Sequence, residues 1–302
     1  MADFVRTGRC PVCLSCRLRK HRKGTFDYRA LRADQIKITD SEYGKVWDLS
    51  RCEACGHLFA DPAPAPEFVS ALYGRVEDPL YDEEAEGRSR NFAVLLDRLE
   101  SFLPRKGDLF DVGAATGIFC DLAKRRGWAV DGVEPSGWAV RFAAAKYGLR
   151  LREGSFEDAS LPPGRFDAVT MIDFIEHTPR PREAIAAAGR ILAPQGLLCL
   201  VTPDIHSLAA RAAGRRWWHL RPGHLAYFSR RSLTTLLAGA GFRILETRRY
   251  AWTFSLFYLL SRPRLLNGLL RSRGLASFLR RVRIKLALGD SFEVYAVKDP
   301  SP

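Results

Sequence analysis

No stretch of the 302-residue sequence is long and apolar enough to span a membrane. The longest apolar run covers residues 251–260, whereas a spanning helix needs about 20 residues. The N-terminus carries charges and cysteines where a secretory signal would have its apolar segment. We therefore expect a cytoplasmic protein, in which thiols stay reduced and paired cysteines bind a metal more readily than they form disulfides.

Two common phosphate-binding loops are also missing. The turn Gly113-x-Ala115-x-Gly117, which Ile118 follows, does not fit the dinucleotide fingerprint G-x-G-x-x-G. The phosphate loop G-x-x-x-x-G-K-[ST] does not occur in the sequence either. The spacing of this turn therefore favours a ligand without a pyrophosphate.

Acidic residues are missing between Glu246 and Asp290, in a protein whose net charge is +13. The stretch predicts a basic amphipathic helix over residues 262–288, within an extension that covers residues 251–289. Such a helix can lie on an anionic membrane surface, which would make the protein peripheral to the membrane. It can also pack on the main domain with its charges in water, and RNA contact is a third option. The basic residues of this region are Arg248, Arg249, Arg262, Arg264, Arg271, Arg273, Arg280, Arg281, Arg283 and Lys285.

The remaining composition is that of a globular α/β protein. Hydrophobic residues make up 47% of the chain, which is enough for a core. From Asp108 to Thr202, apolar runs alternate with helical patterns, and this predicts a doubly wound parallel sheet with helices on both faces. We expect this domain to comprise residues 104–250 with 290–299. A linker and helical cap over residues 63–103 and a small cysteine-bearing module over residues 1–62 would precede it.

A glycine turn follows the first predicted strand of the domain. Gly113 and Gly117, with Ala115 between them, let a ligand approach the backbone beyond the carboxyl end of the sheet. Asp111 can orient this loop or accept a hydrogen bond from a ligand ammonium group. Glu134, at the end of the next strand, suits a bidentate hydrogen bond to a ribose diol. Together they predict a nucleoside with a zwitterionic tail.

Four segments in order resemble the motifs of class I S-adenosylmethionine-dependent methyltransferases. They are DVGAATG from residue 111, GVEPS from 132, FDAVTMIDFIEHTPRP from 166 and LAPQGLLCLVTPD from 192. The resemblance covers about residues 70–250 and implies a Rossmann-like, seven-stranded sheet. Ala115 stands where the family often has glycine, which is a mild departure.

The resemblance also implies which residues hold S-adenosylmethionine. Asp111, Gly113 and Gly117 would line its methionine part, and Glu134 would hold the ribose. The full expected set is Asp111, Gly113, Ala115, Gly117, Glu134, Pro135, Phe156, Glu157 and Asp173. Of these, Phe156 and Glu157 would flank the adenine, and Asp173 would face the sulfonium.

Methyl transfer from a sulfonium is an in-line displacement, so positioning supplies most of the acceleration. A hydroxyl or amine acceptor must also lose a proton, which a neutral histidine accepts well near pH 7. His177 and His224 are the candidate bases, although the first can instead fix a loop and the second can instead pack or cap. Tyr227 would orient the acceptor or belong to the core, and Asp173 completes this catalytic set.

Similar Glu-His pairs occur in members resembling the ubiquinone-pathway O-methyltransferases, some of which place a divalent cation nearby. This likeness implies that Asp173, Glu176 and His177 can ligate a metal. Further along, aromatic and cationic side chains over residues 215–221 are expected to form part of a helical lid, suited to a planar or anionic acceptor. A lid that is only anchored by buried tryptophans is the alternative.

Two C-x-x-C pairs lie in the N-terminal module. Cys10 and Cys13 form the first pair, and Cys52 and Cys55 form the second, followed by Gly56. These are the elements of a tetrahedral four-cysteine zinc site, which would stabilise a module too small to fold on its own core. Cys16 and His57 are alternative ligands. The arrangement resembles zinc-ribbon-like modules of methyltransferases in bacterial sugar and polysaccharide biosynthesis, and of some RNA methyltransferases.

These features predict an enzyme that methylates an oxygen or carbon atom of a small-molecule acceptor. The acceptor classes are a sugar or glycan precursor, a lipid-linked intermediate and a quinone-like compound. An RNA methyltransferase is one alternative, although Met171-Ile-Asp-Phe stands where an NPPY-like motif for base N-methylation would fall. A non-catalytic zinc-module scaffold with a vestigial cofactor pocket is the other alternative. The intact set of Asp111, Gly113, Gly117 and Glu134 argues against it.

Overall fold

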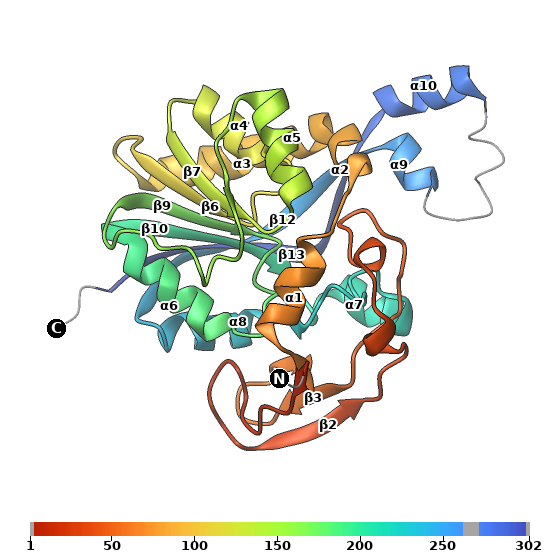
Figure 1. The fold of residues 1–302 in the computed structure, drawn as a ribbon, viewed down its shortest axis with the longest axis vertical. Helices are drawn as coiled ribbons and strands as arrows, with labels where there is room; N and C mark the ends of the chain where they lie inside the picture. Colours follow the sequence, from red (N-terminus) through yellow and green to blue (C-terminus); the bar gives the residue numbers. More distant parts are fainter. Residues whose placement is uncertain (1–2, 262–271, 300–302) are drawn as a thin grey trace.

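The computed structural model describes residues 3–261 and 272–299. Its centre is a seven-stranded sheet with the strand order β12-β13-β10-β9-β6-β7-β8 (Figure 1). The pairs within β10-β9-β6-β7-β8 are parallel, whereas β13 runs antiparallel to both β10 and β12. The seven-stranded methyltransferase-type sheet predicted from the sequence is confirmed. The strands are β6 (Asp108–Val112), β7 (Ala129–Glu134), β8 (Arg152–Glu153), β9 (Phe166–Ile172), β10 (Leu192–Pro203), β12 (Phe242–Ser255) and β13 (Arg283–Lys298).

Helices cover both faces of this sheet, as Figure 1 shows. One layer contains α3 (Ala85–Phe102), α4 (Ile118–Arg125) and α5 (Gly137–Tyr147), and the other contains α6 (Pro181–Ile191) and α8 (Arg230–Ala238). Successive residues of a strand point to opposite faces, so the apolar run of β6 serves both layers. Leu109 packs in the core beneath α3 and α4, while Phe110 packs in the core beneath α6 and α8.

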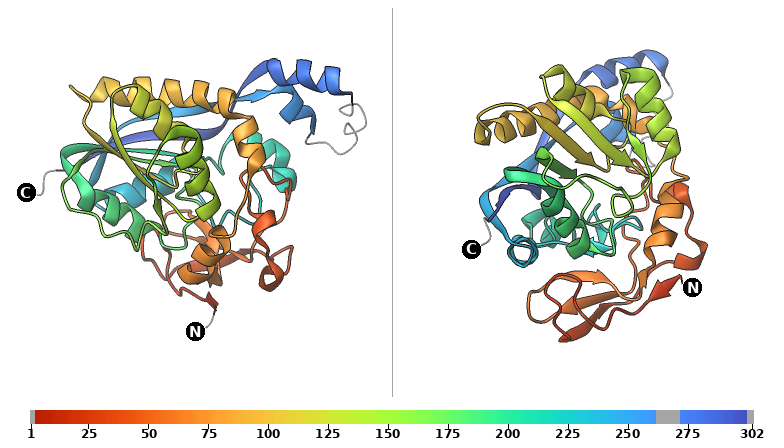
Figure 2. Two further views of the ribbon diagram at one scale, coloured as in Figure 1. Left: turned by 45° about the horizontal axis from the view of Figure 1, so that its top comes forward. Right: turned by 60° about the vertical axis from the view of Figure 1, so that its left-hand side comes forward.

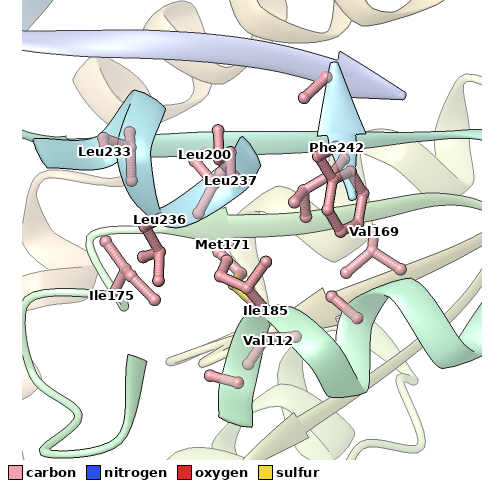
Figure 3. Close-up of a cluster of buried hydrophobic side chains, with 14 of the residues drawn as sticks. Val112, Val169, Met171, Ile175, Ile185, Leu200, Leu233, Leu236, Leu237 and Phe242 are labelled. Atoms are coloured by element: carbon pink, nitrogen blue, oxygen red, sulfur yellow. The ribbon is translucent and has the colours of Figure 1, made fainter. Parts of the chain in front are cut away.

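The second of these cores is drawn in Figure 3. Leu233, Leu236 and Leu237 of α8 lie beside Ile185 of α6 and over Met171 of β9. All five side chains are at most 1% exposed. The apolar stripe of α8 and the residues of β9 that face it therefore pack together in one buried layer.

Three helices connect the N-terminal module to the sheet. They are α1 (Pro66–Tyr73), α2 (Pro79–Glu83) and α3, and α1 and α2 each begin with a proline at the first helical position. Proline suits that position because its fixed φ is helical and the missing N–H would be unpaired there anyway. In Figure 1, α1 runs between the module and the main sheet.

The N-terminal module shares its sheet with the main domain. β2 (Leu18–Arg22), β3 (Leu49–Cys52) and β4 (Leu58–Ala60) form antiparallel pairs, and β11 (Ala226–Tyr227) is added to the edge of β4. A short pair, β1 (Phe4–Val5) with β5 (Ala63–Pro64), closes the module. Because one strand comes from residue 226 onward, the boundary expected at residue 62 does not separate two independent sheets.

The expected helical extension at residues 251–289 is wrong for most of its described part. Residues 251–255 continue β12 and residues 283–289 belong to β13, so that Trp252 pairs with Leu286 and Phe254 with Ile284. Only α9 (Leu256–Ser261) and α10 (Arg273–Arg281) are helical there. Apolar side chains recur at every second position in Ile284, Leu286 and Leu288, which is a strand period that the many arginines obscured.

Three of the arginines counted in that basic stretch, Arg262, Arg264 and Arg271, lie outside the described residues. Among the helices that the structure describes, none combines the length and the apolar character needed to cross a bilayer.

Candidate functional site

A cavity of about 530 Å³ opens at the carboxyl ends of the central strands. Its floor is the glycine turn after β6, the end of β7 and the loops after β8 and β9. Its cover comes from α1, α2 and the start of α3, together with Ile36 and Ile38 of the N-terminal module. Of the expected cofactor residues, these line the cavity: Asp111, Gly113, Ala115, Glu134, Pro135, Phe156, Glu157 and Asp173.

The glycine turn is held in a left-handed conformation. Gly113 has a φ of +75° and Ala115 a φ of +47°. The left-handed region costs a residue with a Cβ roughly 1–2 kcal/mol, which explains why glycine is common at the position of Ala115. Asp111 lies beneath the turn, 3% exposed, and its Oδ1 accepts a hydrogen bond from Thr170 Oγ1 at 2.6 Å. Burial raises the pKa of Asp111 to about 7.

Gly117 has a structural role rather than a place in the cavity wall. It caps α4 with a φ of +81°, and a Cβ there would lie 2.8 Å from Leu149 Cδ1 and 3.0 Å from Ala143 Cβ. It is absent from the residues that line the cavity. Close packing against Ala143 of α5 and against Leu149 explains why this position is a glycine.

Glu134 joins the end of β7 to the glycine turn. Its Oε2 accepts a hydrogen bond from Ala115 N at 2.8 Å, and its Oε1 accepts one from Ser136 N at 2.9 Å. The side chain is 8% exposed and borders the cavity, and burial raises its pKa to about 6. The carboxylate therefore shapes the turn itself, while each oxygen keeps a further lone pair for a ligand.

Two groups of opposite charge, Asp173 and Arg88, line one end of the cavity. Asp173 follows β9 with a φ of +50°, and its buried Oδ1 has no hydrogen-bond partner among the described residues. Arg88 of α3 is 4% exposed, and its Nε likewise has no partner in the described part of the chain. The guanidinium lies 3.8 Å from the centroid of the Tyr81 ring. Burial raises the pKa of Asp173 to about 7, against the opposing effect of Arg88.

The other end of the cavity is suited to a flat ring. Phe156 is 3% exposed, and its ring meets Phe174 edge-on at 6.5 Å between centroids. Glu157 is exposed, and its Oε1 accepts a hydrogen bond from Thr178 Oγ1 at 3.2 Å. Trp138 of α5 also lines this cavity. An aromatic wall with a carboxylate beside it offers stacking and hydrogen-bond acceptance to an amino-substituted base.

His177 lines the cavity and is oriented from behind. Its Nδ1 lies 2.8 Å from the carbonyl oxygen of Gly223 and 2.7 Å from Tyr73 Oη. Since a carbonyl oxygen only accepts, the hydrogen bond to Gly223 assigns the proton to Nδ1 and leaves Nε2 unprotonated. Burial lowers the pKa of His177 to about 3, which keeps the ring neutral at pH 7.

His224 and Tyr227, the other residues expected to act on the acceptor, do not line the cavity. His224 is 4% exposed and meets the His177 ring edge-on, with 4.7 Å between the ring centroids, so it lies behind a residue that lines the cavity. Tyr227 is 2% exposed and belongs to β11, in the core of the N-terminal module. The long-range pairing of β11 with β4 draws this segment away from the cavity.

The metal set implied by the Glu-His pair is only partly assembled. Glu176, His177 and His224 bring one ligand atom each to within 4.8 Å of one another, whereas Asp173 is not a member of this group. Glu176 Oε1 and His224 Nδ1 are buried and have no hydrogen-bond partner among the described residues. One carboxylate and two imidazoles are ligand types that divalent transition metals accept.

The segment over residues 215–221 does not form the expected lid, because none of its residues lines the cavity. Trp217 is 1% exposed and packs with Trp47 in the core of the N-terminal module. Arg221 pairs with Asp40 and also donates to the carbonyl oxygen of Ile38 at 3.0 Å. The aromatic and cationic side chains therefore attach the module to the main domain.

The four cysteines of the N-terminal module converge. Cys10 Sγ and Cys55 Sγ are 3.7 Å apart, Cys13 Sγ and Cys52 Sγ are 3.5 Å apart, and all four sulfurs lie within 4.8 Å of one another. Zinc–sulfur bonds of about 2.3 Å in a tetrahedron give sulfur separations of about 3.8 Å. The donor set therefore fits zinc. Cys16 and His57 are not part of the cluster.

Sequence reasoning missed the residues that cover the cavity. For Arg88 a signal existed, because it occupies the position four residues before Phe92 in the apolar stripe of α3. For Tyr73, Ile36 and Ile38 no local signal existed, since their places depend on how the module packs against the sheet.

Comparison with known proteins points to one family. A family model described as a methyltransferase domain matches residues 84–247, which is more than half of the 302-residue chain. A ubiquinone biosynthesis O-methyltransferase of Ralstonia nicotianae is 30% identical over 220 residues, covering 64% of this chain and 90% of the relative. Proteins of the same name from Sodalis glossinidius and Albidiferax ferrireducens are 34% and 32% identical. Their matches cover 33% and 46% of this chain and 44% and 57% of the relatives, so the chain spans about half the length of these two.

Solved structures agree on the fold. A SAM-dependent methyltransferase from Archaeoglobus fulgidus superposes with a TM-score of 0.50 and 18% identity, covering 73% of this chain and 100% of that one. The 1,6-didemethyltoxoflavin-N1-methyltransferase of Burkholderia thailandensis, solved with S-adenosylhomocysteine, gives a TM-score of 0.51 and 16% identity, covering 82% and 98%. At these identities the likeness establishes the fold alone.

Proposed function

The chain belongs to the class I S-adenosylmethionine-dependent methyltransferase family, and on that premise we propose that it methylates a small-molecule acceptor. The observation that carries the proposal is the cavity at the strand ends, where Asp111, Glu134 and Asp173 gather around one space of about 530 Å³. S-adenosylmethionine would supply a methyl group that is already activated on a sulfonium, which leaves binding and positioning to the protein.

The polar residues of the cavity form two groups, one suited to the nucleoside of the cofactor and one suited to its amino-acid tail. Glu134 would accept the hydrogen bonds of the ribose diol, and Phe156 and Glu157 would flank the base. At the other end, Asp111 and Asp173 would hold the ammonium group. Arg88, buried and without a hydrogen bond to its Nε among the described residues, would hold the carboxylate. The Asp173 carboxylate and the Arg88 guanidinium would then each gain a partner of opposite charge.

His177 is the residue proposed to receive the acceptor proton. Its ring is neutral at pH 7, its unprotonated Nε2 is the acceptor atom, and its orientation is maintained by Gly223 and Tyr73. A general base works best when its pKa lies near the operating pH, so this role requires the bound acceptor and cofactor to raise the pKa of His177 from about 3. His224 would support this ring from behind rather than touch the acceptor.

For the acceptor, we infer transfer to oxygen or carbon of a compound with an apolar face. Ile36, Ile38 and Val69 line the outer part of the cavity wall that the module and α1 provide. The relatives are named ubiquinone biosynthesis O-methyltransferases, which supports a quinone-like acceptor above a sugar or glycan precursor. A lipid-linked acceptor is compatible with the same wall.

Zinc is proposed to be structural, held by Cys10, Cys13, Cys52 and Cys55. The cluster lies far from the glycine turn in the chain but adjoins the core beneath α6 and α8. By fixing the module, the metal would fix the loop that presents Ile36 and Ile38 to the cavity.

Calorimetry with S-adenosylhomocysteine tests the proposed function directly. Saturable binding of about one molecule per chain is expected. Absence of heat at high micromolar ligand, from protein that is folded by circular dichroism, would leave only a zinc-bearing scaffold. An untargeted search for metabolites that gain a methyl group would then identify the acceptor.

A further inference from the structure

A two-helix lobe extends beyond the main domain. α9 and α10 are carried on the ends of the long strands β12 and β13 and contact each other. Figures 1 and 2 show both helices projecting past the edge of the layered domain, away from the N-terminal module. The side of the lobe that faces away from the domain is therefore open to solvent.

The outer side of α10 carries two exposed apolar side chains. Phe278 is 63% exposed and Leu275 is 41% exposed, and their spacing of three residues places them on one face of the helix. Leu279, which follows at the next position, is 7% exposed and lies on the side of this face that is turned toward the domain. The six residues of α9, whose sequence is LFYLLS, are all half-buried. A lobe that packed only on its own domain would bury these side chains.

The charge of the lobe has one sign. No acidic residue occurs between Glu246 and Asp290. Arg280 pairs with Glu83 of α2, and Arg283 pairs with Glu86 of α3, so these two arginines attach the lobe to the domain. Arg281 and Lys285 are exposed, and neither has an ion pair among the residues that the structure describes.

We propose that this lobe docks on an anionic bilayer, with Phe278 and Leu275 inserted among the lipids and Arg281 and Lys285 facing the headgroups. A bilayer surface satisfies both features, because interfacial helices bury an apolar face while basic residues attract anionic lipids. The phosphates of RNA would use the cations but would leave the exposed phenylalanine and leucine without a partner. The observations therefore favour a membrane.

Docking has a consequence that rests on the proposed function. The helix α2, which Arg280 holds through Glu83, also carries Tyr81, and Tyr81 lines the cavity. The lobe is therefore coupled to the wall of the cavity. An acceptor dissolved in the bilayer would suit this cavity, because Ile36 and Ile38 make part of its wall apolar.

Sedimentation with phosphatidylcholine vesicles, with and without phosphatidylglycerol, tests the docking. The full chain is expected to pellet with the anionic vesicles only. The pair Leu275→Ser/Phe278→Ser and the pair Arg281→Gln/Lys285→Gln should each stay in the supernatant. For the loss of two basic residues the drop in partitioning should be about 30-fold.

Matched variants elsewhere on the surface serve as controls. Leu208→Ser removes a leucine that is 76% exposed on α7, and Arg141→Gln/Arg150→Gln removes two exposed arginines. These variants should pellet like the wild type.

Three outcomes would overturn the proposal. They are no pelleting of the wild type, equal loss in the controls, and RNA binding that depends on Arg281 and Lys285 without vesicle binding. Calorimetry with S-adenosylhomocysteine on the same variants separates this result from a failure of the proposed function, because docking and cofactor binding use different residues.

Discussion

The pairing proposed between Arg88 and the cofactor carboxylate can be tested with one substitution and two ligands. Arg88→Met keeps an unbranched apolar stem against the Tyr81 ring and removes only the charge. A hydrogen bond to a charged group is worth about 1.5–3 kcal/mol, and truncating one partner of a buried charge pair costs about 2–5 kcal/mol. Taking about 2–3 kcal/mol, affinity for S-adenosylhomocysteine should fall about 30- to 140-fold.

The second ligand isolates the carboxylate. 5′-Methylthioadenosine has the nucleoside and the thioether but no amino-acid tail, so its affinity should be the same for Arg88→Met and for the wild type within about threefold. Arg90→Met is the control on the same helix, because Arg90 is exposed and pairs with Glu86 at 2.7 Å. It should bind both ligands normally. Equal weakening of both ligands by Arg88→Met, or no weakening of either, would refute the assignment.

The remaining predictions concern the ribose, the pH dependence and the metal. Glu134→Gln should weaken both ligands at least about tenfold, since both contain the ribose, and calorimetry showing normal binding of 5′-methylthioadenosine would exclude that role. Burial raises the pKa of Asp111 to about 7, so the folded protein keeps a proton that the unfolded chain releases near pH 4. The contribution of Asp111 to the free energy of unfolding is therefore complete below about pH 4. It is lost as the pH rises to 7, by at most about 1.4 kcal/mol per pH unit. Urea unfolding of the ligand-free proteins should show that the free energy of unfolding declines less from pH 5 to 7 in Asp111→Asn than in the wild type. The same decline in both proteins would contradict the raised pKa of Asp111. Elemental analysis should find about one zinc per chain, lost in Cys52→Ser but kept in Cys16→Ser, and the reverse pattern would move the site to Cys16.

Glu134 has a second, structural role, which decides how it should be substituted. From the sequence, it is a carboxylate at a strand end that faces a ligand. In the structure it accepts hydrogen bonds from two backbone N–H groups as well, from Ala115 and Ser136. Glu134→Ala would leave both donors without an acceptor, at a cost of about 1–3 kcal/mol each. Glutamine, which keeps one acceptor oxygen, is therefore the cleaner substitution.

The sequence by itself determined the central sheet, the meeting of Asp111, Gly113 and Glu134 around one space, and the convergence of the four cysteines that are proposed to bind zinc. These inferences succeed because they rest on local rules. Apolar runs of the right period become strands, the carboxyl ends of parallel strands meet at one edge, and a C-x-x-C pair forms a turn of fixed shape.

Only the tertiary structure decided what covers that space. Tyr73 and Ile36 reach the cavity because α1 and the N-terminal module fold over the strand ends, and Tyr227 leaves it because β11 pairs with β4 instead. The strands β12 and β13 pair with each other although their residues lie far apart in the chain, and this pairing decides for a strand where both a helical and a strand period can be read. Such contacts depend on packing between distant segments, and no local pattern of residues encodes them.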